Sequence, residues 1–335
     1  MAIPCAGTGS RSLAEKPVLQ KPVIVAPGLM RPMLEPMLPL DRVEVRWFAD
    51  VDEAIALAPL ADIGWLDILR LEDDPRPVLA AKKAKWLHTT LAGLSKIPVG
   101  FARERGVIVT KGTGLTSKAV ADYGLMGVLM LAKRVDEVVR AQDRREWLPQ
   151  PPCNDDLDGA KALIIGYGAI GSQLGERLKA CGMMVTGVRR QADPAQGMIG
   201  AEDWRTRLGE YDYVILAAPE TPETYHMIGT AEFDAMKTGA RFVNIARGSM
   251  VDQDALIAAL KGGRLRSAFV DVADPEPLPA DHPLWAAPNI IITMHMSGRG
   301  NLPMYVQAAK RFADNVHRYL AGEPLEAVAD LERGY

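Results

Sequence analysis

Hydrophobic and polar positions alternate in short blocks along the chain from residue 22 onward. Five runs rich in β-branched and aromatic residues lie at 22–27, 43–48, 63–69, 85–91 and 106–111. Helical patterns, at 51–61 and 78–84, lie between some of these runs. Strands that alternate with helices are typical of βαβ units. The pattern therefore predicts an α/β fold with a parallel sheet over residues 22–111.

A second series of the same kind occupies the later part of the chain. A long helical pattern runs from near Ser117 to about Arg134, and a polar, proline-containing segment follows it to residue 159. Six apolar runs then lie at 162–167, 183–188, 213–218, 240–246, 267–273 and 289–295. Near-continuous apolar runs are expected of parallel strands that are buried on both faces. The chain is thus predicted to form two α/β domains, followed by an amphipathic helix at 304–320.

Composition narrows the class of protein. A chain of 335 residues is long enough for two domains, and its net charge of −3 argues against a broad nucleic-acid surface. The most apolar helical stretch, residues 119–132, is too short to span a bilayer. Residues 1–20 hold no apolar core of signal-peptide length, and we expect them to form a loose leader.

The cysteines point to a reducing compartment. Cys5, Cys153 and Cys181 lie far apart and show no spacing typical of metal ligands. We therefore expect neither structural disulfides nor a metal site, and a cytoplasmic location.

A glycine motif opens the second series. Gly166, Gly168 and Gly171 form GxGxxG directly after a strand pattern and before a helical one. The first glycine permits a tight turn, the second permits close approach of a pyrophosphate, and the third permits packing of helix on strand. The free N–H groups at the start of that helix, near Ala169 and Ile170, favour phosphate binding. The alternative is a glycine-rich turn without a ligand.

An arginine pair stands where a dinucleotide fold usually carries an acid. Arg189 lies 23 residues beyond Gly166, at the end of the second strand pattern, and Arg190 follows it. An acid would accept a hydrogen bond from the ribose 2′-OH, whereas arginine can pair with a 2′-phosphate. The motif therefore predicts NADP(H) as the preferred cofactor, with NAD(H) possible and a solvated basic turn as the alternative.

Three later strand patterns end in residues suited to carbonyl chemistry. Arg247 follows the run 240–246, Glu276 follows the run 267–273, and His295 ends the run 289–295. Ligands in such sheets bind beyond the carboxyl ends of the strands. An arginine can hold a 2-oxo carboxylate, a histidine can transfer a proton, and a carboxylate can orient that histidine.

Five motifs occur in the order seen in one enzyme family. They are GYGAIG, APETPETYHMIG, VNIARGSMVDQDAL, FVDVADPEPLP and NIIITMHMSG. In these motifs the chain resembles the D-isomer-specific 2-hydroxyacid dehydrogenases, clearly over about residues 85–335. The resemblance implies NAD(P)H-dependent reduction of a small 2-oxo acid, such as glyoxylate, hydroxypyruvate or a bulkier one, to a D-2-hydroxy acid.

The resemblance also implies roles for individual residues. Arg247 would bind the substrate, His295 would be the acid/base and Glu276 its partner. Asp271 would contact the nicotinamide carboxamide. The remaining implied cofactor residues are Pro219, Thr224, Ala246 and Gly298, and the loop that caps the substrate carboxylate would contain Leu91, Ala92 and Gly93.

The fold implied by the family has two doubly wound domains. A Rossmann cofactor domain at 118–297 would be inserted in a flavodoxin-like substrate domain formed by 1–117 and 298–335. The family usually forms homodimers through the cofactor domains, so we expect a homodimer and no nucleic-acid or membrane partner.

Some positions depart from the family pattern. Met294 stands where proline is usual before the catalytic histidine, Ser297 where alanine is common, and Asp122 where glutamate is frequent. These departures leave the substrate open. Phosphonate or phosphoglycerate oxidation, or a cofactor-sensing corepressor role on the same fold, are the alternatives.

Overall fold

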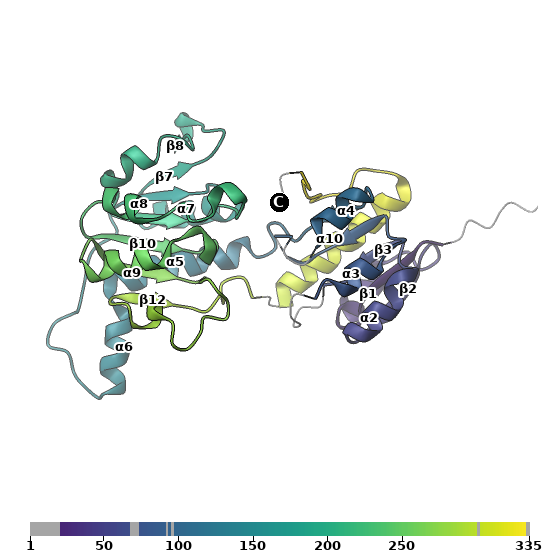
Figure 1. The fold of residues 1–335 in the computed structure, drawn as a ribbon, viewed down its shortest axis with the longest axis horizontal. Coiled ribbons are helices and arrows are strands. Elements are labelled where there is room, and N and C mark those ends of the chain that lie inside the picture. The colour runs from purple at the N-terminus through teal and green to yellow at the C-terminus, as the bar shows by residue number, and fades with distance from the viewer. Residues whose placement is uncertain (1–20, 68–73, 92, 95–96, 300–301, 333–335) are drawn as a thin grey trace, which may run out of the picture.

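The computed structural model describes residues 21–67, 74–91, 93–94, 97–299 and 302–332. Within them the chain forms two parallel sheets, which lie in separate halves of the molecule (Figure 1). The expected leader, residues 1–20, and Ala92 lie outside the described residues. The predicted α/β class with two parallel sheets is confirmed.

The first half is a five-stranded sheet with the order β2-β1-β3-β4-β5. Its strands are β1 (Val23–Pro27), β2 (Glu44–Phe48), β3 (Ile63–Trp65), β4 (Trp86–His88) and β5 (Ile108–Thr110). All four pairings are parallel. This order is that of flavodoxin-like sheets, in which ligands bind at the carboxyl edge.

Helices cover both faces of this sheet. They are α1 (Arg31–Leu34), α2 (Val51–Leu57), α3 (Arg76–Ala80), α4 (Val99–Glu104) and, from the end of the chain, α10 (Leu302–Ala321). The buried face of α10 includes Phe312, whose ring lies 4.9 Å from Trp65 and 5.0 Å from Trp86. The amphipathic pattern at 304–320 therefore places the C-terminal helix in the core of the first sheet.

The second half is a seven-stranded sheet with the order β12-β11-β10-β9-β6-β7-β8. Its strands are β6 (Lys161–Ile165), β7 (Met184–Val188), β8 (Met198–Ile199), β9 (Tyr213–Leu216), β10 (Ala240–Asn244), β11 (Leu265–Val270) and β12 (Ile290–Ile292). Every pairing is parallel. The order reverses between β6 and β9, which is the point where doubly wound sheets bind dinucleotides.

Five α-helices accompany this sheet: α5 (Ser117–Lys133), α6 (Val135–Asp143), α7 (Ala169–Ala180), α8 (Thr230–Ala235) and α9 (Gln253–Lys261). Short 3-10 helices are η1 (Gly28–Met30), η2 (Glu35–Met37), η3 (Ala58–Leu60), η4 (Pro194–Gln196), η5 (Arg205–Glu210), η6 (Pro222–Thr224), η7 (Gly248–Met250) and η8 (Pro283–Ala286). In the described part of the chain, no helix is both long and apolar enough to cross a membrane.

Helix α6 is the main element that the sequence pattern did not predict. Arg134 has φ +50° and ends α5, and α6 then begins in a segment expected to be irregular. Asp136 and Glu137 lie in its first turn, where acidic groups favour a helix N-terminus. Figure 1 shows α6 projecting from the seven-stranded half.

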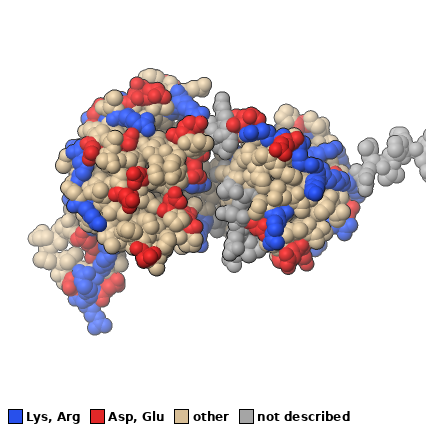
Figure 2. All heavy atoms as spheres, in the orientation of Figure 1, with Lys and Arg blue, Asp and Glu red and all other residues tan. Residues whose placement is uncertain are grey.

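The surface shown in Figure 2 carries basic and acidic side chains interspersed over both halves. No single-sign area dominates that face of the molecule, which agrees with the net charge of −3.

Candidate active site

The glycine turn between β6 and α7 has the form that a dinucleotide requires. Gly166 has φ +97°, and a Cβ there would lie 2.3 Å from Ala218 N. A Cβ on Gly171 would lie 2.2 Å from Gly166 O, so helix and strand pack in direct contact. A Cβ on Gly168 would meet nothing within 4 Å, and Gly168 is the N-cap of α7 without a side-chain cap. Free N–H groups therefore face open space at Ala169 and Ile170, as a bound pyrophosphate requires.

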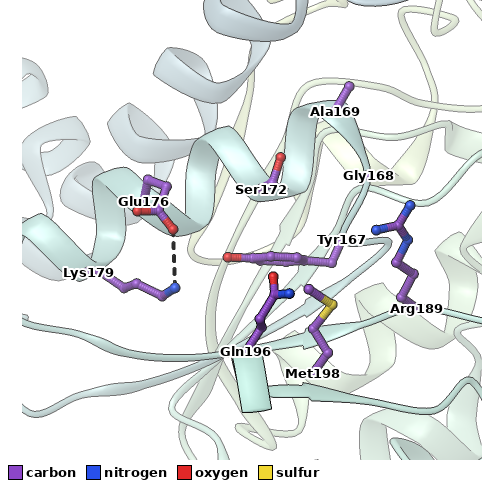
Figure 3. A pocket seen from close by; sticks show the side chains of 9 residues that line it. All are labelled: Tyr167, Gly168, Ala169, Ser172, Glu176, Lys179, Arg189, Gln196 and Met198. Atoms are coloured by element: carbon purple, nitrogen blue, oxygen red, sulfur yellow. Dashed lines mark hydrogen bonds and ion pairs between the residues drawn. The ribbon is translucent and has the colours of Figure 1, made fainter. Parts of the chain in front are cut away.

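A cavity of about 570 Å³ adjoins this turn (Figure 3). Its lining residues are Tyr167, Gly168, Ala169, Ser172, Glu176, Lys179, Arg189, Gln196 and Met198. Figure 3 shows Arg189 on one side of the cavity, and the Lys179–Glu176 ion pair of 3.2 Å on the other. No hydrogen bond or ion pair of the Arg189 guanidinium is found among the described residues. An arginine at this position is able to bind an anion held near Gly168.

Tyr167 was missed by the sequence reasoning, although it lies within the glycine motif. It is buried, and a Cβ on Gly175 or Gly187 would approach its ring or hydroxyl to 2.4 Å. The absence of side chains at Gly175 and Gly187 leaves space for the Tyr167 ring, which lines the cavity. The positions of these two glycines relative to the GxGxxG motif were the sequence feature that could have indicated Tyr167.

Pro219 and Thr224 lie on the loop that follows β9. The Thr224 hydroxyl lies 3.1 Å from Pro219 O, and it accepts a hydrogen bond from Thr221 N at 2.8 Å. This capping arrangement fixes the loop beside Gly166, because β9 pairs directly with β6.

Arg247 follows β10 and is held through its backbone. Asn244 Oδ1 accepts from Ala246 N at 3.0 Å, and Asn244 Nδ2 donates to Arg247 O at 3.0 Å. The Arg247 Nη1 atom donates to Ala246 O at 2.6 Å. Asn244 was not singled out in the sequence, because an asparagine within an apolar strand pattern carries no distinctive signal.

The structure brings the predicted substrate loop to Arg247. A Cβ built on Gly93 would lie 3.7 Å from Arg247 Nη2. Leu91 is half-buried on the same loop, whereas the third predicted residue, Ala92, is outside the described part.

His295 and Glu276 form the hydrogen-bonded pair that the motifs predict. His295 Nδ1 lies 2.6 Å from Glu276 Oε2, and Glu276 Oε1 accepts from Ala273 N at 3.0 Å. Burial acts to raise the pKa of the Glu276 carboxyl, but these two hydrogen bonds and the charges of His295 and Arg247 outweigh it and lower the pKa. The carboxylate is therefore ionised at neutral pH and within electrostatic reach of Arg247.

Asp271 holds the segment that carries His295. It is 1% exposed, and its Oδ1 accepts from Thr293 Oγ1 at 2.6 Å and from Met296 N at 2.9 Å. Its Oδ2 accepts from Ser297 N at 3.2 Å, and the Asp271 carbonyl accepts from His295 N. The Asp271 carboxylate thus holds the turn at 293–297, which contains His295, against the end of β11. We call this segment the histidine turn.

That turn is left-handed at two consecutive positions. Met294 has φ +53° and His295 has φ +54°, so His295 follows the end of β12 in a turn instead of ending the strand. Gly298 follows this turn, and a Cβ on it would meet nothing within 4 Å. Among the described residues, no cluster of three or more His, Cys, Asp or Glu side chains could hold a metal ion.

The family model described as "D-isomer specific 2-hydroxyacid dehydrogenase, NAD binding domain" matches residues 125–297. The chain therefore belongs to the D-isomer-specific 2-hydroxyacid dehydrogenases, a family of oxidoreductases. The match includes β6 to β12, the glycine turn, Arg247, Glu276 and His295.

Two enzymes from other organisms are similar in sequence to most of this chain. The chain is 34% identical over 253 residues to a glyoxylate reductase of Thermococcus litoralis, covering 72% of this chain and 76% of that one. It is 32% identical over 255 residues to a D-3-phosphoglycerate dehydrogenase of Methanocaldococcus jannaschii, which is 75% of this chain. The chain spans 48% of the length of that second relative.

The fold is shared with a solved structure from Xanthobacter autotrophicus. That D-isomer specific 2-hydroxyacid dehydrogenase, in complex with NADPH and MES, is 25% identical, with a TM-score of 0.76. The likeness covers 94% of this chain and 99% of that one.

Proposed function

We propose that the protein reduces a 2-oxo acid to a D-2-hydroxy acid with NADPH as the preferred cofactor. The observation that carries this proposal is the His295–Glu276 pair, 2.6 Å apart, within electrostatic reach of Arg247 on the sheet that bears the glycine turn. A protonated imidazole, a fixed carboxylate and an arginine are the groups that a carbonyl reduction beside a carboxylate requires.

Each residue has a distinct part in this chemistry. The Arg247 guanidinium binds the substrate carboxylate, and the loop at Leu91 and Gly93 closes over the same group. NADPH, when bound, supplies the hydride. His295 donates a proton from Nε2 to the carbonyl oxygen, because its Nδ1 is engaged by Glu276. The ionised Glu276 carboxylate stabilises the protonated imidazole before the transfer and orients its ring.

The preference for NADPH rests on Arg189 and its cavity. Gly168, Ala169, Ile170 and Gly171 would hold the pyrophosphate at the start of α7, and Pro219, Thr224, Ala246, Asp271 and Gly298 would surround the rest of the cofactor. Arg189 would pair with the 2′-phosphate, and Arg190 beside it would add positive charge. NAD(H) remains the alternative cofactor for the same site.

The substrate side chain is proposed to be apolar. Met294 is 57% exposed and Met296 is 37% exposed, on either side of His295. Flexible thioether side chains make an adaptable apolar wall. This favours a bulkier 2-oxo acid such as phenylpyruvate over glyoxylate and hydroxypyruvate. Oxidation of 3-phosphoglycerate is a second candidate, favoured by the 32% identity to the enzyme of Methanocaldococcus jannaschii.

The decisive experiment is a spectrophotometric panel with the purified protein. Glyoxylate, hydroxypyruvate, phenylpyruvate and 3-phosphohydroxypyruvate are each reduced with NADPH and with NADH, and the values of kcat/KM are compared. The proposal expects phenylpyruvate with NADPH to give the highest value. Binding of the dinucleotide without turnover on any 2-oxo acid would overturn the enzymatic proposal and favour the corepressor role.

The domain roles follow from the same proposal. Residues 118–297 would bind the dinucleotide, and residues 1–117 with 298–335 would bind the substrate. A homodimer through the cofactor domain is supported by exposed apolar residues on α5 and α6: Met126, Leu129, Val135, Val138 and Val139. Trp147, beyond α6, is 96% exposed. Sedimentation velocity tests the dimer.

A cytoplasmic location, supported by the free thiols of Cys153 and Cys181, is tested by cell fractionation.

A further inference from the structure

A buried carboxylate lies at the end of β3, outside the set of residues that the motifs assign. Asp67 is 5% exposed and follows β3 by two residues. Its Oδ2 accepts from Thr89 Oγ1 at 3.0 Å and from Thr90 N at 2.7 Å. Both donors belong to the start of the loop that follows β4, so Asp67 binds one strand end to the next.

The loop after β4 is fixed at each successive residue. Thr89 N donates to Thr110 O at 2.9 Å, and Leu91 N donates to Thr89 Oγ1 at 3.1 Å. Leu91 O accepts from Gly112 N at 2.8 Å. The hydroxyl of Thr89 therefore receives one hydrogen bond from the loop and passes one to Asp67, which makes Asp67 the anchor of this chain of contacts.

Thr90 is enclosed from two further sides. Trp65 Nε1 donates to Thr90 Oγ1 at 3.1 Å, within the buried aromatic core. A Cβ on Gly112 would lie 1.8 Å from Thr90 O, so only glycine allows the two backbones to approach this closely. These contacts fix Thr89, Thr90 and Leu91 in place, and a Cβ on Gly93, two residues beyond Leu91, would lie 3.7 Å from Arg247 Nη2.

Burial of a carboxylate needs a compensating gain. Removing the charge of an aspartate from water is unfavourable, and packing alone would be served as well by an apolar residue. The hydrogen bonds from Thr89 and Thr90 to Asp67 hold the start of the loop in place. Hydrogen bonds to a carboxylate are stronger than neutral ones and therefore suit this purpose.

We propose that Asp67 is a positioning residue for substrate binding, acting through Thr89 and Thr90 on the loop that faces Arg247. This inference rests on the proposed function, in which that loop closes over the substrate carboxylate. In this role Asp67 acts through Thr89 and Thr90, and no direct contact with the cofactor or the substrate is assigned to it. Its loss should therefore weaken substrate binding and leave the cofactor unaffected.

The test compares Asp67→Ala with a matched variant of the aspartate at the other end of β3. In the wild type, Asp62 Oδ2 at the opposite end of β3 accepts from Val23 N at 2.9 Å and from Lys83 Nζ at 3.0 Å. Asp67→Ala should raise the KM for the 2-oxo acid about tenfold or more, because the loop loses both hydrogen bonds to the Asp67 carboxylate. Asp62→Ala should lower the melting temperature without changing that KM. The Kd of NADPH should stay constant in both.

Two further variants keep the test independent of folding defects. Asp67→Asn retains an acceptor oxygen at the same place and should recover part of the lost affinity. Thr89→Val removes the hydroxyl and should reproduce the effect of Asp67→Ala. The double variant should be no worse than the more affected single variant, because both changes break one chain of contacts.

Hydrogen exchange separates this proposal from the function on which it rests. Amides at Thr90 and Leu91 should exchange faster in Asp67→Ala, while those of β6 (Lys161–Ile165) should not change. If the wild type reduces no 2-oxo acid, the proposed function fails, and exchange still tests the anchoring. Unchanged KM and unchanged exchange in folded Asp67→Ala and Asp67→Asn would overturn the proposal, as would an equal rise of KM in Asp62→Ala.

Discussion

His295 Nδ1 and Glu276 Oε2 lie 2.6 Å apart, with 38% and 37% of the two side chains exposed. The pair is open to solvent on one side, which leaves His295 Nε2 accessible to a substrate. Replacing His295 by Asn removes the proton donor and keeps a polar side chain. We expect kcat for 2-oxo acid reduction to fall about 10²–10⁴-fold, with the Kd of NADPH little changed. His317→Gln, on the exposed side of α10, is the control and should be fully active.

Glu276→Gln tests the carboxylate itself. Glutamine preserves the shape of the side chain but removes the charge that compensates a protonated imidazole. Since a charge-assisted hydrogen bond contributes about 1.5–3 kcal/mol when shielded and less when partly exposed, kcat should fall about tenfold. The measurement is steady-state reduction at neutral pH. Unaltered kcat in the glutamine variant would exclude the pairing from catalysis.

Asp271→Asn distinguishes two roles for one side chain. The family resemblance implies contact with the nicotinamide, whereas the carboxylate here accepts hydrogen bonds from Thr293, Met296 and Ser297. Because an amide offers one acceptor atom in place of two, the histidine turn should loosen. We expect kcat to fall about tenfold or more, while the Kd of NADPH changes less than about threefold. Asp274→Asn, on an exposed neighbour, is the control. A large rise in the Kd of NADPH with kcat preserved would favour the nicotinamide contact.

Arg189→Ala should change the cofactor preference. The loss of a charge-assisted bond to a 2′-phosphate should weaken NADPH about ten- to a hundredfold and leave NADH nearly unaffected. Titration of protein fluorescence with each cofactor measures both constants. Arg190→Ala serves as the neighbouring control and should have the smaller effect. Equal weakening of NADPH and NADH would mean that Arg189 does not recognise the phosphate.

Because His88 is buried, we expect the free energy of unfolding to fall in mild acid. Burial, together with the charge of Arg311, lowers the pKa of His88 to about 3. The pKa of an unfolded histidine is about 6.5, so between pH 6.5 and pH 3 the unfolded chain binds a proton at His88 that the folded chain does not. The contribution of His88 to the free energy of unfolding is therefore fully present above about pH 6.5 and is lost as the pH falls. The slope from this group approaches about 1.4 kcal/mol per pH unit.

Urea unfolding at pH 7.5 and pH 5 measures this effect. His88→Phe places a neutral ring between Trp65 and Phe312, whose centroids lie 4.7 and 5.2 Å from the histidine ring. The variant should lose less stability than the wild type between the two pH values. Identical losses in both proteins would assign the acid sensitivity to other groups.

Much of the fold followed from the apolar runs of the second series, because strands buried on both faces leave a continuous signal. Helix α6 was not predicted, because the segment after Arg134 was interpreted as polar and irregular and because the start of the helix depends on the left-handed Arg134. The run at 63–69 was interpreted as a single strand, but β3 ends at Trp65, and this places Asp67 at the strand end.

The site was predictable where strand ends carry distinctive residues, as at Arg247, Glu276 and His295. The contacts of Asp271 and Asp67 were not, because most of their partners are backbone N–H groups and hydroxyls brought near by turns. Which backbone groups lie near a carboxylate depends on the path of the folded chain, and no regular spacing of residues in the sequence indicates it.

The left-handed turn at Met294 limits how this chain can exchange sequence with its relatives. Proline fixes φ near −65°, whereas Met294 has φ +53°. The proline that is usual in the family cannot enter this turn as a single change. Residues 293–297 should therefore be exchanged as one segment, because a chimera that joins two family members within it is expected to misplace the histidine even when Arg247, Glu276 and His295 are kept.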